Sequence, residues 1–412
     1  MGNTPNIRFK GFTDDWEQRK LIDYLEVSSE KNRDNRFTKD DVLSVSGEYG
    51  IVNQIEFQGR SFAGASVSNY GVVENGDVVY TKSPLKSNPY GIIKTNKGIP
   101  GIVSTLYAVY KPKEITDSKF VQIYFELDSR MNSYMHPLVN KGAKNDMKVS
   151  AENALKGMVS FPKKDEQEMI SLYFSSLDNL IALHQRKCDE TKKLKKFMLQ
   201  KMFPKKNEKK PEIRFAGFTD DWEQRKLSEC AGFRRGSFPQ PYGNKEWYDG
   251  EGAMPFVQVA DVADDMKLVD DTKQKISKLA QPMSVYADKG SVLVTLQGSI
   301  GRVAITQYGA FVDRTVLIFD KYNQDIDKTF WAYIIKEKFI DEARKAPGGT
   351  IKTITKEALS DFDLMLPNYD EQKKLGAFLV SIDNLITLHQ RKCDEIKEIK
   401  KFMLQNMFPQ KG

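Results

Sequence analysis

The sequence has few of the residues that carry most enzymatic and metal chemistry. Its 412 residues include only three histidines and three cysteines, and the cysteines form no C-x-x-C pair of the kind that structural zinc sites use. Motifs of hydrolases, zinc proteases, nucleotide-binding loops and paired-carboxylate nucleases are missing. The N-P-P-Y tetrapeptide of adenine methylases is also missing, since the nearest sequence is SNPYG at 87–91. We therefore expect no catalysis, no cofactor and no bound metal.

The sequence also lacks a long apolar run and a strong excess of one charge. No stretch of 18 apolar residues occurs, and the polar start MGNTPNIRF has no signal-peptide core. Together with the few cysteines, this predicts a soluble, cytoplasmic protein with no membrane partner. The 63 Lys and Arg residues exceed the 56 Asp and Glu residues by only seven. Such a balance suits a polyanionic partner only where positive charges gather on one surface.

The sequence does contain enough apolar material for more than one domain. Hydrophobic residues make up 40% of it and include 24 Phe, 17 Tyr and 4 Trp, which excludes wholesale disorder. Because a domain usually takes roughly 100 to 200 residues, the length predicts two or three domains.

Two segments of the sequence occur twice. Residues 5–21 recur at 211–227 with 15 of 17 positions identical, and residues 177–206 recur at 382–411 with 23 of 30 positions identical. The sequences between these segments show no comparable match. We interpret the pattern as one frame that holds two unlike inserts, with selectivity in the inserts. A tandem duplication whose inserts drifted freely is the alternative.

Each half of the sequence ends in a segment suited to one long helix. Residues 165–202 and 370–407 contain no proline and only one glycine, Gly376. Both segments have the alternating three-and-four spacing of a coiled-coil seam. The seam residues are Ile170, Phe174, Leu177, Ile181, His184, Cys188 and Thr191, and Leu375, Ile382, Ile386, His389, Cys393, Ile396 and Met403. We expect the helices to pair antiparallel within one molecule, with an approximate two-fold axis; a parallel homodimer is the alternative.

Two groups of polar residues on these helices each allow two interpretations. His184 and Cys188, with His389 and Cys393, could supply four zinc ligands if the helices crossed there. Packing along a polar seam is the role we expect, because an antiparallel pair brings the copies together only at its midpoint. Residues 189–210 include nine lysines and only three acidic residues. This run is either a solvated helix face or a contact for phosphate or an acidic protein.

Alternating and β-branched stretches dominate both inserts, which span about 22–150 and 228–350. Each insert is therefore predicted to be an α+β domain of about 120 residues. Strands are predicted at 76–82, 101–111, 121–127, 255–262, 290–306 and 310–320, and helices near 118–140 and 328–346. The sequence GSIGR at 298–302 lacks the Lys-Ser or Lys-Thr of a nucleoside-triphosphate loop and predicts a hairpin turn.

Several predicted turns in the inserts are rich in hydrogen-bond donors without matching acids. Arg and Lys contact phosphates and guanine, and Asn and Gln read adenine. We take these residues as candidate DNA contacts, with solubility as the alternative role of any single one. The candidates are Lys82, Lys86, Asn88, Tyr90, Lys141, Lys144, Asn145, Arg234, Arg235, Gln297, Ser299, Arg302, Thr350 and Lys352.

Three repeated motifs resemble one known family. They are W-E-Q-R-K-L at 16–21 and 222–227, P-x-x-D-E-Q at 162–167 and 367–372, and K-F-M-L-Q-x-M-F-P at 196–204 and 401–409. Over essentially its full length, the chain resembles the specificity subunit of type I restriction-modification enzymes. Residues 290–305, followed by AFVDRTVLIF, are similar to the second target recognition domain of that family. YTKSPLKSNPYG at 80–91 departs from the usual glycine hairpin, so the contacts of the first insert are the least defined.

The resemblance implies a non-catalytic DNA reader. Each insert would recognise one half of a split, asymmetric site in double-stranded DNA, and the helical pair would set the spacer between the halves. The family works with two modification subunits, which methylate adenine using S-adenosylmethionine, and two ATP-driven restriction subunits, so this chain itself would bind no cofactor. The helix ends would be shared docking surfaces. The candidates there are Lys195, Lys196, Phe197, Lys400, Lys401 and Phe402.

The predicted fold is α+β, with two globular target recognition domains separated by two long helices in an antiparallel intramolecular coiled coil. The predicted division is 1–160 for the first target recognition domain, 161–204 for the central helix, 205–362 for the second target recognition domain and 363–412 for the C-terminal helix. Two other functions remain open at this point. The chain could be a protein-interaction scaffold, or a DNA-binding regulator that works alone.

Overall fold

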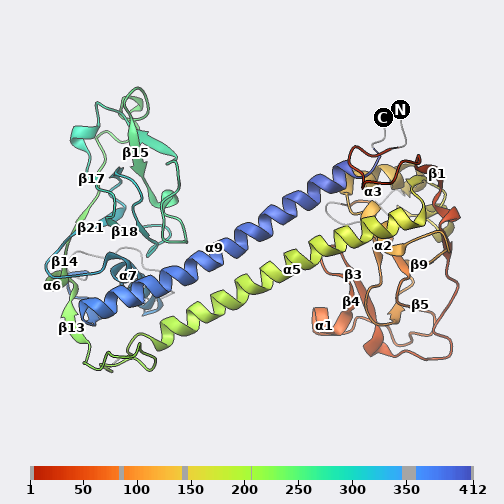
Figure 1. Ribbon diagram of the computed structural model, residues 1–412, viewed down its shortest axis with the longest axis horizontal. Helices are drawn as coiled ribbons and strands as arrows, with labels where there is room; N and C mark the ends of the chain where they lie inside the picture. Colours follow the sequence, from red (N-terminus) through yellow and green to blue (C-terminus); the bar gives the residue numbers. More distant parts are fainter. Residues whose placement is uncertain (1–3, 83–87, 142–146, 206, 346–358, 410–412) are drawn as a thin grey trace. The chain divides into compact units, whose positions relative to one another are not determined.

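The chain forms two compact units. Unit 1 contains residues 1–183 together with 392–412, and unit 2 contains residues 184–391. The boundaries fall inside both long helical segments, so each unit holds one insert and a part of each helix (Figure 1). The structure, a computed structural model, describes residues 4–82, 88–141, 147–205, 207–345 and 359–409.

The insert of unit 1 is an α+β domain. Its strands are β1 (Glu17–Lys20), β2 (Leu25–Val27), β3 (Leu43–Ser46), β4 (Gly50–Asn53), β5 (Gly71–Val73), β6 (Val78–Thr81), β7 (Ile93–Thr95), β8 (Gly101–Val103), β9 (Tyr107–Pro112), β10 (Asn140–Lys141), β11 (Met147–Lys148) and β12 (Met158–Phe161). A four-stranded sheet has the order β2-β9-β6-β7, and the ladders β1-β12, β3-β4, β5-β8 and β10-β11 accompany it. All these pairs are antiparallel, which suits hairpins and short connections.

The helices of this insert include one segment that we predicted as a strand. They are α1 (Gln54–Gln58), α2 (Ser118–Tyr124), α3 (Asp128–Met135) and α4 (Ala151–Ala154). The prediction of a strand at 121–127 is wrong, because most of this run belongs to α2. Asp117 caps α2 by accepting a hydrogen bond from the Lys119 N–H at 3.0 Å. A short, continuously apolar run fits a buried helix as well as a buried strand, and here the cap and the core select the helix.

The insert of unit 2 is also α+β. Its strands are β13 (Glu223–Lys226), β14 (Ala231–Arg235), β15 (Met254–Val257), β16 (Gln274–Ile276), β17 (Tyr286–Ala287), β18 (Val292–Thr295), β19 (Val303–Ile305), β20 (Ala310–Val312), β21 (Val316–Tyr322) and β22 (Asp363–Leu366), and its helices are α6 (Leu227–Cys230) and α7 (Lys328–Lys345). Two four-stranded sheets have the orders β14-β21-β18-β19 and β16-β15-β20-β17, and β13 pairs with β22. The antiparallel pairing of β18 with β19 confirms the hairpin predicted at 298–302.

Two long helices run through both units, as predicted. They are α5 (Lys164–Lys201) and α9 (Tyr369–Asn406), each one residue from the predicted position. In unit 1 the Cys393 thiol lies 3.9 Å from the Ile181 carbonyl oxygen, and in unit 2 the Cys188 thiol lies 3.9 Å from that of Ile386. In each unit, a residue from the second half of one helix thus contacts a residue from the first half of the other. The helices are therefore antiparallel and belong to one chain, which confirms the predicted coiled coil.

The repeated segments make the same contacts in both units. Arg8 forms a two-bonded ion pair with Glu166 in unit 1, and Arg214 forms the equivalent pair with Glu371 in unit 2, with all four N–O distances 2.7 Å. The strand at the end of each copy of the first repeat pairs with the strand before the long helix, as β1-β12 and as β13-β22. The sequence repeat therefore corresponds to a repeated structural frame, which has the same contacts around each insert.

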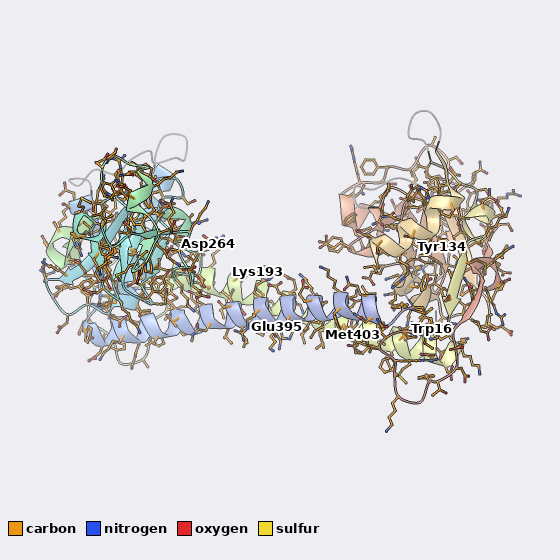
Figure 2. All side chains as sticks on the ribbon, turned by 90° about the horizontal axis from the view of Figure 1, so that it is seen from above. Trp16, Tyr134, Lys193, Asp264, Glu395 and Met403 are labelled. Atoms are coloured by element: carbon orange, nitrogen blue, oxygen red, sulfur yellow. The ribbon has the colours of Figure 1, made fainter. Side chains whose placement is uncertain are left out.

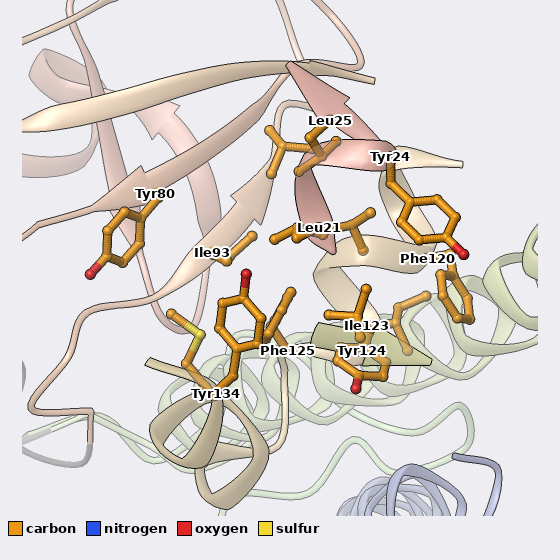
Figure 3. Close-up of a cluster of buried hydrophobic side chains, with 14 of the residues drawn as sticks. Leu21, Tyr24, Leu25, Tyr80, Ile93, Phe120, Ile123, Tyr124, Phe125 and Tyr134 are labelled. Atoms are coloured by element: carbon orange, nitrogen blue, oxygen red, sulfur yellow. The ribbon is translucent and has the colours of Figure 1, made fainter. Parts of the chain in front are cut away.

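The end of each long helix enters the core of one insert. In unit 1, Phe408 follows α9 and packs edge-on against Trp16 at 5.9 Å between ring centres. In unit 2, Phe203 follows α5 and packs on Trp222 at 5.8 Å. The core that Phe408 joins also contains Phe120, Tyr124 and the other side chains shown in Figure 3. The M-F-P motif that closes each helix is thus an internal packing motif.

Candidate functional site

Two of the predicted contact residues in unit 1 lie inside the protein. Asn88 and Tyr90 are each only 6% exposed. The Asn88 amide donates to the Asp128 carboxylate at 2.7 Å, and the Tyr90 ring packs edge-on against His136. The Tyr80 hydroxyl holds this segment against the core by donating to the Tyr90 carbonyl at 2.7 Å. The expectation that Asn88 and Tyr90 present their side chains at the surface is therefore wrong.

Of the other candidates in unit 1, Lys82 alone has a side chain that the structure describes. Lys82 directly follows β6 and is partly buried. Lys86, Lys144 and Asn145 lie outside the described residues, as does the side chain of Lys141, whose backbone belongs to β10. The contact surface that the sequence predicts for unit 1 is therefore reduced to Lys82 among the described side chains.

Two of the candidate arginines of unit 2 pair with acids, and three other candidates are exposed. Arg234 pairs with Asp320, with its Nε 2.9 Å from the carboxylate, and the Arg302 Nε lies 3.1 Å from the Asp264 carboxylate. An arginine committed to a carboxylate has fewer donors for a ligand. The exposed candidates are Arg235 at the end of β14 and Gln297 and Ser299 in the turn between β18 and β19, whereas Thr350 and Lys352 lie outside the described residues.

Two exposed arginines that the sequence reasoning missed are positioned by phenylalanine rings. The Arg314 guanidinium carbon lies 4.7 Å from the ring centre of Phe238 in unit 2, and that of Arg60 lies 4.6 Å from the ring centre of Phe62 in unit 1. Within the described part of the chain, neither side chain forms an ion pair. Arg60 and Phe62 are two residues apart, so alternation of arginine with an aromatic residue is a local signal for that stack. Arg314 and Phe238 are far apart in the sequence, so no local signal marks the second stack.

Polar residues at the meeting point of the helices pack against one another. In unit 2 the Nδ1 atoms of His184 and His389 lie 3.1 Å apart, so one ring donates to the other. Their neighbours Cys188 and Cys393 are buried and face backbone carbonyls. No group of three His, Cys, Asp or Glu side chains suited to a metal occurs among the residues described. These contacts match the polar seam expected for the four side chains.

A charged cluster joins the insert to the helices in each unit. In unit 1 the Lys400 amine lies 2.6 Å from carboxylate oxygens of both Glu126 and Asp178. Burial alone would lower the pKa of Lys400, but these two carboxylates raise it above its usual value. In unit 2 the Lys195 amine binds Asp383 at 2.6 Å, and the Tyr333 hydroxyl donates to the same carboxylate at 2.5 Å. Lys195 and Lys400, predicted as docking residues, are thus engaged within the chain.

Next to each charged cluster, the helices expose apolar side chains one turn apart. Leu194 and Phe197 on α5 are 44% and 46% exposed, and Ile399 and Phe402 on α9 are 48% and 53% exposed. Side chains three positions apart share one helix face. We call these the 194/197 pair and the 399/402 pair. Charged residues such as Lys193 and Glu395, labelled in Figure 2, are exposed on the same helices, as are Lys196 and Lys401.

Sequence comparisons find similarity to type I restriction-modification specificity proteins. The profile described as "Type I restriction modification DNA specificity domain" matches residues 219–398. The putative type I restriction enzyme MjaX specificity subunit of Methanocaldococcus jannaschii is 23% identical over 94% of this chain and 91% of its own length. The MjaVIII specificity subunit of the same organism is 25% identical over 76% of this chain and 74% of its own length.

Structure comparisons agree on the fold. The S subunit of a type I restriction-modification system from M. genitalium covers 99% of this chain and 100% of its own, with a TM-score of 0.61 and 13% identity. A chain solved in work on complex assembly and conformational transition of the type I R-M system covers 95% of this chain and 97% of its own, with a TM-score of 0.51 and 17% identity.

The fold defines a class of protein in which a repeated helical frame carries two unlike α+β inserts. The described helices include none long and apolar enough to cross a membrane. Within this class, residues 219–398 match the specificity-domain profile, and over most of its length the chain is similar to type I restriction-modification specificity subunits.

Proposed function

We propose that this chain is the non-catalytic subunit that reads a bipartite, asymmetric target in double-stranded DNA and directs adenine methylation and DNA cleavage by its partner subunits. As a specificity subunit it binds DNA and assembles with other subunits of the restriction-modification system, for which the cytoplasm is the place of action. The observation that carries the proposal is the repeated frame around two unlike inserts. Equivalent frames suit equivalent partners, whereas unlike inserts suit unlike half-sites.

The repeat also supports two equal docking positions. The 194/197 and 399/402 pairs lie 205 positions apart in the sequence, and each offers an exposed phenylalanine beside a branched apolar side chain. Exposed apolar groups of this kind are typical of protein contact surfaces. We therefore assign one modification subunit to each pair, with Lys196 and Lys401 at the edge of the contact. Two restriction subunits complete the proposed assembly.

Exchange of one insert tests the proposed division of labour. Residues 22–150 are replaced by the corresponding insert of another specificity subunit, and adenine methylation is mapped across the genome in cells that also contain the modification subunit. We expect only one half of the methylated sequence to change, because each insert contacts its own half-site. Exchange of residues 228–350 is the matched control and should change the other half. If either exchange altered both halves, independent reading by the two inserts would be refuted.

Salt dependence separates DNA reading from the scaffold alternative. A protein that neutralises phosphates releases counterions, so its affinity for duplex DNA falls with a log–log slope of about −0.9 per phosphate contacted. The chain assembled with its modification subunit should show such a slope, and an affinity independent of salt would favour a scaffold. A regulator that works alone would instead bind its target with the same affinity and sequence preference in the absence of the modification subunit.

A further inference from the structure

The turn between β20 and β21 in unit 2 exposes Arg314, and the acid next to it in the sequence, Asp313, is hydrogen-bonded within the turn. The carboxylate of Asp313 is buried, with only 5% of the residue exposed. It accepts hydrogen bonds from the Thr315 N–H at 2.9 Å and the Thr315 hydroxyl at 2.5 Å. These bonds close the turn on itself. Asp313 therefore shapes the turn, and the Arg314 side chain between these two residues extends to the surface.

Phe238 positions the Arg314 side chain. It reaches the turn because the chain after β14 passes very close to β20: the Ser237 N–H donates to the Val312 carbonyl at 2.8 Å. A Cβ atom at Gly236 would lie 2.1 Å from that same carbonyl oxygen, so glycine is required there. The guanidinium then stacks over the Phe238 ring. Stacking restricts the side chain without using its in-plane N–H donors.

Arg314 borders a hollow with further polar groups. The hollow has a volume of about 430 Å³, and its lining includes Phe238, Gln240, Tyr242 and Arg314. Tyr242 is 56% exposed and packs edge-on against Phe238 at 4.6 Å between ring centres. An amide, a phenol and a guanidinium therefore surround one concave surface beside an aromatic ring. This combination can hydrogen-bond to the edge of a base as well as contact its face.

We propose that Arg314 reads a guanine in the half-site recognised by unit 2, with Gln240 and Tyr242 beside the same base pair. The inference rests on the proposed function and names the residue that carries it. A planar guanidinium with free in-plane donors matches the O6 and N7 atoms of guanine, a two-bonded contact that lysine cannot reproduce. Because stacking on Phe238 already orders the side chain, less conformational entropy is lost on binding. Arg234 and Arg302 are bound to carboxylates and are not positioned in this way.

Substitution by lysine and by glutamine tests the inference. The chain with Arg314→Lys or Arg314→Gln is assembled with its modification subunit, and methylated adenines are mapped across the genome. We expect both variants to lose discrimination at one base pair of a single half-site, by about 5- to 150-fold, which corresponds to about 1–3 kcal/mol for a two-bonded base contact. The other half-site should stay unchanged. Binding to duplexes that differ only at that base pair gives the same ratio directly.

The control is an exposed arginine of the same unit that has an acid partner. Arg225 on β13 pairs with Glu223 at 2.7 Å, so Arg225→Lys should leave the methylated sequence unchanged. If Arg314→Lys keeps the full motif while Arg314→Gln only reduces the salt slope by about one, Arg314 contacts a phosphate and base reading is refuted. If the unaltered assembly methylates no split sequence at all, the proposed function itself fails. Thermal unfolding of each variant confirms that an exposed substitution has left the fold intact.

Discussion

Units 1 and 2 connect their inserts to the same helical pair with different chemistry. In both units an interhelical lysine–aspartate pair lies at the junction, as Lys400–Asp178 and as Lys195–Asp383. The insert of unit 1 adds a carboxylate, Glu126, on the lysine side. The insert of unit 2 adds a hydroxyl, from Tyr333, on the aspartate side. An insert can therefore vary widely as long as it completes the hydrogen bonding of a partly buried pair that the frame supplies.

The inserts also differ beside their shared aromatic contact. Phe120 packs on Trp16 in unit 1, and Phe330 packs on Trp222 in unit 2. Beyond these rings α7 continues to Lys345, whereas α2 ends at Tyr124 and α3 begins at Asp128. The break in unit 1 is held by Arg130, which donates to the carbonyls of Tyr124 and Leu404 and so caps two helix ends. Burial lowers the pKa of Arg130 to about 10, so it stays charged at neutral pH.

The exposed arginine–phenylalanine stacks show the same divergence. In unit 2, Arg314 lies between β20 and β21, and its partner ring follows β14. In unit 1, Arg60 follows α1, and its partner ring is only two residues further along. These are not equivalent places in the two folds. Such unlike surfaces on equivalent frames agree with the proposal that the two inserts read different half-sites.

Removal of the two tryptophans of the repeated W-E-Q-R-K-L motif should cause the largest loss of stability, and the loss should be equal in the two units. Trp16 and Trp222 are fully buried in equivalent aromatic clusters. Trp16→Ala and Trp222→Ala should each reduce the free energy of unfolding of their unit by about 3–5 kcal/mol, since each leaves a large cavity. Denaturant unfolding followed by circular dichroism measures both. A cost below about 1 kcal/mol for one variant would break the equivalence of the frames.

The charged junctions should respond unequally. Lys400→Met leaves two carboxylates, Glu126 and Asp178, close together, whereas Lys195→Met leaves one, Asp383, that still accepts from Tyr333. We expect a destabilisation of about 1–3 kcal/mol for Lys400→Met and a smaller one for Lys195→Met. Partial exposure of Asp178 places the first value toward the lower end.

Two measurements sharpen this second comparison. The added substitution Glu126→Gln should restore part of the stability lost in Lys400→Met, because it removes one of the repelling charges. The same loss should diminish in high salt, which screens the remaining pair. The two lysine variants could instead lose equal amounts of stability, with none restored by Glu126→Gln. That result would show that the groups supplied by the inserts do not affect stability at the junction.

The smallest effect on stability is expected at the 194/197 and 399/402 pairs, which we propose as docking positions. Phe197→Ala and Phe402→Ala remove exposed rings, so the free energy of unfolding should change by no more than about 0.5 kcal/mol. Each should nevertheless weaken the binding of one modification subunit by about 5- to 30-fold, as loss of an apolar contact residue does. Titration calorimetry with the modification subunit measures this. Leu279→Ala, at another exposed apolar position, is the control and should bind like the unaltered chain.

Much of the frame could be predicted from the sequence because its signals are local. The absence of proline from two stretches of 38 residues located α5 and α9, and the repeat itself indicated that the two halves share one structure. The inserts were less predictable. The run at 121–127 fits a helix or a strand equally well until Asp117 and the surrounding core are known. The sequence around Asn88 has the composition of a surface turn, yet Asn88 and Tyr90 are held against the core by hydrogen bonds to Asp128 and Tyr80.

The repeated frame, the antiparallel helical pair and the resemblance to specificity subunits could be predicted from the amino-acid order, because helix-forming stretches and repeats consist of consecutive residues. Which charged side chains face outward depends on the folded arrangement. Lys195 and Lys400 were predicted as docking residues, but each is bound by one or two carboxylates from distant segments. The carboxylate of Asp313, next to Arg314 in the sequence, is bonded to Thr315. The availability of a charge depends on neighbours that folding brings together, and their distance along the chain conceals them.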